Sequence, residues 1–200
     1  MEVNYKEMPG KAVQMQGLGR QLNGELSSAW TSVNELRSTW HGVRYNSLIM
    51  LFNKVTGSVN KILSLVVSTI PDQLGTIARN YSIVDGDPCA NVEPASPTAI
   101  EAIENSDTSS MSYDPATALS VKESVTKNLS NAKGYMENIV TVFNTVDWVS
   151  EARSNYQSQL ETLKGEIVAA IDGINTQFST LMSEAENDMK AVENANNVGQ

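Results

Sequence analysis

The 200-residue chain has little of what catalytic and metal-binding sites are usually built from. It contains one histidine, His41, and one cysteine, Cys89. A single histidine leaves little from which to build a cysteine–histidine metal site or a Ser-His-Asp triad, and a single cysteine allows no disulfide within the chain. A glycine-rich phosphate loop is also missing. We expect His41 to face solvent at a turn, Cys89 to be an exposed thiol, and the protein to have no enzymatic activity, metal or cofactor.

Clustered positive charge is missing as well. The chain has 14 lysines and arginines against 23 acidic residues, a formal net charge of -9, and no run of five basic residues. Binding to nucleic acid or to an anionic lipid surface depends on clustered basic side chains. We therefore expect no nucleic-acid partner and no membrane association.

Long apolar runs are the third absence. The best candidate, Ile62 to Ile70, is about half the length needed to span a bilayer. The first seven residues have neither the basic nor the apolar region of a standard signal peptide. If the protein leaves the cell, we expect a route that is independent of such a peptide.

Helical periodicity dominates what is present. Apolar residues recur every three or four positions in four stripes, which run from Lys11 to Leu36, from Leu48 to Tyr81, from Leu119 to Phe143 and from Tyr156 to Val192. This spacing predicts four long helices that pack with the left-handed geometry of bundles. Pro71 falls inside the second stripe and should kink or break that helix near Ser68 and Thr69.

A segment of different composition separates the two pairs of stripes. Residues 86–114 are rich in proline and serine, which predicts a linker, with one short helical turn possible at Thr98 to Ile103. Asp114 before Pro115 is typical of an N-cap followed by a first-turn proline. The chain therefore divides into hairpin 1 (1–85), the linker (86–114) and hairpin 2 (115–200).

The two hairpins have an internal repeat. An offset of 108 residues maps Trp40 onto Trp148, and the flanking apolar stripes align with it. In the first turn Gly42 supplies a residue that tolerates positive φ. In the second turn its place is taken by Ser150, which can cap the next helix.

A helix, a Trp-x-Gly turn and a second helix together resemble the WXG family, the ESAT-like substrates of type VII (ESX) secretion. The family's export motif, Tyr-x-x-x-Asp/Glu past the second helix, is matched by Tyr81 to Asp85. The second copy keeps the acid, Glu193, and has Met189 in place of the tyrosine. The resemblance covers residues 1–85 well and residues 115–200 in degraded form.

The resemblance implies an all-α fold in which two long hairpins pack antiparallel as an elongated four-helix bundle. Family members usually form this bundle as dimers of separate hairpins, so this chain would be a monomeric pseudo-dimer. A second helix of about 40 residues is about 60 Å long. The 29-residue linker can reach about 90 Å when extended, so the fusion is geometrically feasible.

The resemblance also implies a function and its residues. Tyr81, Asp85 and Trp148 would meet at one end of the bundle and form the signal read by the motor ATPase of the secretion system, while Trp40 and Gly42 would shape the turn at the other end. The protein would then be a secreted substrate or an export escort, with a co-secreted toxin or effector as a second candidate partner. It would be cytoplasmic before export and secreted or at the cell surface afterwards. A non-exported helical scaffold and, less favoured, a membrane-active helical toxin are the alternatives.

Overall fold

A computed structural model describes residues 3–197 of the chain. Within that range the protein is helical, and its only β-type pairing is a bridge between His41 and Ser112. The elements are α1 (Met8–Leu36), α2 (Val43–Ser64), the π-helical segment η1 (Leu65–Thr69), α3 (Ile70–Asp85), α4 (Pro115–Asn144) and α5 (Glu151–Asn197). The prediction of an all-α fold is confirmed, and the helices are compatible with a bundle.

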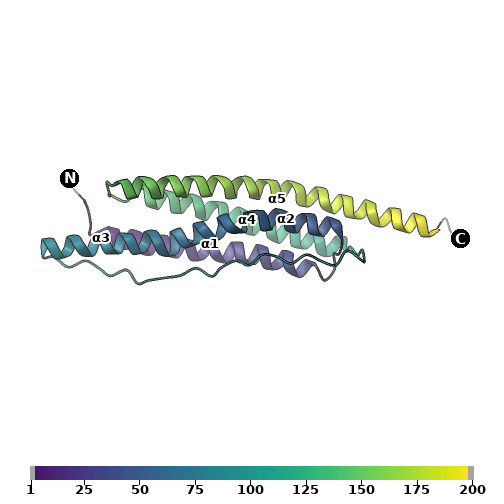
Figure 1. The fold of residues 1–200 in the computed structure, drawn as a ribbon, viewed down its shortest axis with the longest axis horizontal. Helices are drawn as coiled ribbons and strands as arrows, with labels where there is room; N and C mark the ends of the chain where they lie inside the picture. The colour runs from purple at the N-terminus through teal and green to yellow at the C-terminus, as the bar shows by residue number, and fades with distance from the viewer. Residues whose placement is uncertain (1–2, 198–200) are drawn as a thin grey trace.

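Two helix pairs build most of the bundle. α1 packs mainly on α4, α2 packs on α5, and α3, which continues the direction of α2, packs along α1. Figure 1 shows the α1–α2 turn and the α4–α5 turn at opposite ends of an elongated molecule, with the last part of α5 projecting beyond the other helices. One continuous apolar core runs through it, because the inward residues of every helix are almost completely buried.

The second stripe forms one continuous helical rod with a local irregularity. Residues 65–69 have π-helical geometry and end two positions before Pro71. Proline has no N–H to donate, and an inserted π-turn lets the backbone accommodate this without stopping. The Thr69 hydroxyl donates to the Ser64 carbonyl over 3.3 Å, five residues back. The expected disturbance at Ser68 and Thr69 is therefore present as a π-turn.

Residues 87–113, which we call the strap, run extended along hairpin 1 from the end of α3 to the start of α4 (Figure 1). The short helical turn expected at Thr98 to Ile103 is wrong, because the backbone there pairs with side chains instead of with itself. Val92, Ile100 and Ile103 are buried against the helices. Cys89 is half-buried against the core, so the expectation of an exposed thiol is also wrong.

Asparagine carboxamides hold the strap. Asn53 accepts from the Ile103 N–H and donates to the Ile103 carbonyl, both at 2.8 Å. Three other asparagines make the same pair of hydrogen bonds, each to the N–H and carbonyl of one strap residue: Asn23 to Thr98, Asn60 to Ile100 and Asn46 to Ser106. A carboxamide presents an N–H donor and a C=O acceptor side by side, as a neighbouring β-strand would. The strap backbone is thereby satisfied without a sheet.

At Gly75 the strap lies close against α3. A Cβ at this position would lie 2.9 Å from Val92 Cβ, whereas a Cβ at Gly57 in α2 would meet nothing within 4 Å. Gly75→Ala should therefore displace the strap and destabilise the protein, by about 1–3 kcal/mol for an overpacked site. Gly57→Ala should stabilise it by about 0.5–1 kcal/mol. Urea denaturation of both variants checks this, and equal effects would contradict the close approach.

Candidate functional site

The predicted export motif lies at the end of α3. Tyr81 and Asp85 are one helical turn apart and so share a face of the helix. Tyr81 is 43% exposed, and the intervening Ile83 and Val84 are 72% and 86% exposed. Figure 1 shows this end of α3 reaching past the start of α1 and past the α4–α5 turn. The motif is thus displayed on a projecting helix end.

The segment that precedes α1 lies on this motif. The Tyr5 ring stacks on the Tyr81 ring, with centroids 5.9 Å apart and planes 12° from parallel. The Tyr5 hydroxyl donates to Asp85 Oδ2 over 2.7 Å. Tyr5 is only 9% exposed. Tyr81 and Asp85 therefore act together on one phenol, through stacking at the ring and a hydrogen bond at the hydroxyl.

The electrostatics of this contact raise the pKa of Tyr5 to about 12, first because its hydroxyl donates to Asp85, then because of burial and the nearby negative charges of Asp85 and Asp87. Ionising the phenol would place two anions side by side. Since the pKa in the folded protein is raised, the contact stabilises the fold below about pH 10 and is lost as the pH rises through about 12.

The Asp85→Asn substitution tests this geometry directly. It removes the carboxylate that raises the pKa of Tyr5 and keeps the volume of the side chain. We expect the pKa of Tyr5 to fall toward the ordinary phenol value. Titration of the tyrosine ring signals by NMR measures it, with Tyr5→Phe assigning the signal. An unchanged pKa of Tyr5 in Asp85→Asn would contradict the hydrogen bond.

Trp148 is at the same end of the molecule, in the α4–α5 turn. It is 7% exposed and packs against Tyr156, with ring centroids 6.1 Å apart. Its aromatic partner among the described residues is thus Tyr156 and not Tyr81. The link to the motif is indirect, because the Asn4 N–H donates to Asp147 Oδ2 over 3.3 Å. Ser150 caps α5 as expected, accepting from the Arg153 N–H over 3.1 Å.

Trp40 and Gly42 lie at the opposite end. Trp40 is 1% exposed, and its ring packs with those of Tyr45, Tyr113 and Phe178. Gly42 has a φ of 112°, which confirms the expected positive φ at this turn. His41 is half-buried, so the fully solvent-facing position expected for it is wrong. Its backbone N–H donates to the Ser112 carbonyl over 2.9 Å.

The sequence did not predict the residues of the segment before α1 that contact the motif and its neighbours. Asn4, Tyr5 and Lys6 belong to no helical stripe, and their contacts cross 80 or more positions of sequence. The three residues bind Asp147, Asp85 and Asp87, respectively. The only available signal was the aspartates at the end of α3, Asp85 and Asp87, and Asp147 in the second turn. Aspartates are too common at helix ends and turns to indicate a binding partner.

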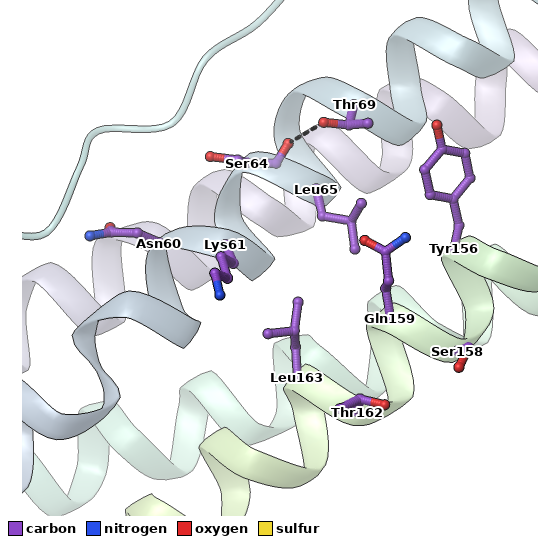
Figure 2. Close-up of a pocket in the computed structure, with 10 residues that line it drawn as sticks. All are labelled: Asn60, Lys61, Ser64, Leu65, Thr69, Tyr156, Ser158, Gln159, Thr162 and Leu163. Carbon is purple, nitrogen blue, oxygen red and sulfur yellow. Dashed lines mark hydrogen bonds between the residues drawn. The ribbon is translucent and has the colours of Figure 1, made fainter.

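A surface groove of about 690 Å³ lies between the middle of hairpin 1's second helix and α5. Figure 2 shows Leu65, Tyr156, Gln159 and Leu163 directed toward it from the two sides. It lies at the π-turn, beyond which α3 follows α1 and leaves α5 (Figure 1). Its lining mixes apolar and neutral polar side chains with one cation, Lys61, and gives no indication of a particular ligand.

No family model, curated protein or solved structure matches the chain. Across residues 3–197, no cluster of three or more histidine, cysteine or acidic side chains could hold a metal ion. None of the helices in that range has a stretch that is long and apolar enough to cross a bilayer.

Proposed function

We propose that the protein is a substrate or export escort of a type VII (ESX-like) secretion system, recognised by the motor ATPase through Tyr81 and Asp85. One observation carries the proposal: these two side chains, displayed on a projecting helix end, jointly bind an aromatic phenol. A ring and a carboxylate one turn apart can anchor a partner by stacking and by a charge-assisted hydrogen bond. Recognition of this kind needs no catalytic group.

We further propose that the chain is a covalent counterpart of an antiparallel dimer of WXG hairpins. Three features support this: the two turns lie at opposite ends, α1 packs on α4 and α2 on α5, and the strap joins the far ends. Trp148 is almost fully buried, so we assign it the shaping of the second turn and assign partner contact to Tyr81 and Asp85. Light scattering should give the monomer mass of 21.7 kDa; an obligate dimer would contradict the pseudo-dimer.

A secretion assay in the native cell tests the export role. Tyr81→Ala and Asp85→Ala should each abolish release into the medium, because each removes one half of the recognition pair. Asn80→Ala is the matched control, since it changes an exposed side chain in the same turn of α3 and should be released normally.

The two alternative functions give different results. Equal release of Tyr81→Ala, Asp85→Ala and wild type would overturn the export signal, and intracellular retention of all of them would favour a scaffold. Leakage of liposomes at micromolar protein would instead favour a membrane-active protein.

A further inference from the structure

We infer that the N-terminal segment Val3–Glu7 is a removable cover for the export signal, and that the export partner binds Tyr81 and Asp85 with an aromatic hydrogen-bond donor that replaces Tyr5. The inference rests on the proposed function and adds to it the regulation of the signal and the chemistry of the partner. It is drawn from the contacts of three consecutive residues.

Each of these three residues is bound to a different carboxylate at this end of the molecule. The Asn4 N–H donates to Asp147 over 3.3 Å, the Tyr5 hydroxyl donates to Asp85 over 2.7 Å, and the Lys6 ammonium pairs with Asp87. The segment thereby connects the end of α3 to the turn of hairpin 2. A protein that stacked on the same side of Tyr81 and bonded to Asp85 would have to displace Tyr5.

Tyr5 occupies both halves of the signal at once. Its ring covers one face of Tyr81, and its hydroxyl binds the Asp85 carboxylate. Tyr81 nevertheless remains 43% exposed, so its other parts stay open to a partner. A partner that stacked on the covered face and bonded to Asp85 would need the same two groups that Tyr5 supplies, an aromatic ring and a donor.

The tethers on either side of Tyr5 are weak enough to release. The Lys6 and Asp87 side chains are 54% and 52% exposed, and exposed ion pairs contribute little. The Asn4 contact is long and exposed. Glu7, the N-cap of α1, makes no side-chain capping bond, and the backbone bonds that tie the segment to the helix, from Glu7 N–H to the Asn4 carbonyl and from Met8 N–H to the Tyr5 carbonyl, are both long at 3.3 Å. Tyr5 is its principal anchor.

A partner can bind only those molecules in which the cover is open. Its apparent affinity is therefore the intrinsic affinity multiplied by the open fraction. Removing the anchor should therefore strengthen binding. Tyr5→Ala removes the ring and the hydroxyl, and Tyr5→Phe removes the hydroxyl alone. Glu7→Gln is the matched control, because Glu7 is an exposed neighbour without a capping bond.

The experiment measures two quantities on the purified full chain. Hydrogen exchange over residues 3–7 and 79–87 reports opening, and surface-immobilised motor ATPase from the same cell reports binding. We expect Tyr5→Ala to exchange faster at both segments and to bind about tenfold more tightly. Tyr5→Phe should lie between Tyr5→Ala and wild type, and Glu7→Gln should match wild type. Adding Tyr81→Ala to Tyr5→Ala should abolish binding.

The failures of the two ideas can be told apart. If Tyr81→Ala abolishes binding but Tyr5→Ala leaves it unchanged or weakens it, the cover is wrong and the export signal stands. Unchanged exchange in Tyr5→Ala also overturns the cover. If Tyr81→Ala and Asp85→Ala bind as well as wild type, or neither the wild type nor Tyr5→Ala binds, the export signal itself fails and the cover fails with it.

Discussion

Substituting Trp40 with alanine is expected to lower the free energy of unfolding by about 3–5 kcal/mol, as for other large aromatic residues removed from a core. The indole is 1% exposed. It contacts Tyr45 at the start of α2, Tyr113 at the end of the strap and Phe178 in α5. Its loss would open a cavity where the first turn, the strap and hairpin 2 meet, and these parts cannot collapse together without moving helices.

Trp148→Ala is the matched comparison for that result. Trp148 lies at the corresponding turn of hairpin 2, is 7% exposed and packs with one aromatic ring, that of Tyr156. We expect its loss to fall at or below the lower end of the same range. Urea denaturation followed by circular dichroism measures both variants. A larger loss for Trp148→Ala than for Trp40→Ala would contradict the role given to Trp40.

The second large effect is expected at Asn53, which holds the middle of the strap. Asn53→Ala leaves the N–H and carbonyl of Ile103 without their side-chain partner. A buried group left unpaired costs about 1–3 kcal/mol. Because the site is only partly buried, we expect about 2–3 kcal/mol for the pair of groups. Asn187→Ala, at an exposed position of α5, should change stability little.

Asn53→Asp tests the same pair of hydrogen bonds by making the stability of the protein depend on pH. A carboxylate cannot donate to the Ile103 carbonyl, whereas a carboxylic acid can, so the pKa of the new group should be raised in the folded protein. The variant should therefore gain stability relative to wild type as the pH falls through that raised pKa. A protease specific for glutamate provides a second readout, because Glu93, Glu101 and Glu104 lie in the strap and should be cut faster in both variants.

The helices could be predicted from the sequence because their determinants are local. Apolar residues at steps of three and four define each buried face, Pro71 marks the irregularity, and Asp114 and Ser150 mark helix starts. The length of the linker showed that it could span the bundle. The course of the chain between the helices depends on tertiary contacts, for which the same reasoning has no rule.

The strap shows why that reasoning stopped short. Its anchors are asparagines, which a reading of apolar periodicity assigns to a solvated face. Asn46, Asn53 and Asn60 are seven residues apart and therefore lie along one side of α2. This spacing was a usable signal. Nothing comparable marked Tyr5, because its partners Tyr81 and Asp85 are brought to it only by the packing of α3 along α1.

The source of the strap's anchors bears on the order in which the protein folds. The side chains that grip its backbone between residues 93 and 106 all come from hairpin 1: Gln16, Asn23, Asn46, Asn53, Asn60 and Ser68. During synthesis these partners leave the ribosome before the strap does, and the strap leaves before Pro115. Every one of these anchors is thus already present in the chain while α4 and α5 are still unmade. Once it lies along hairpin 1, the strap places the start of α4 at the end of the bundle from which α4 runs back along α1.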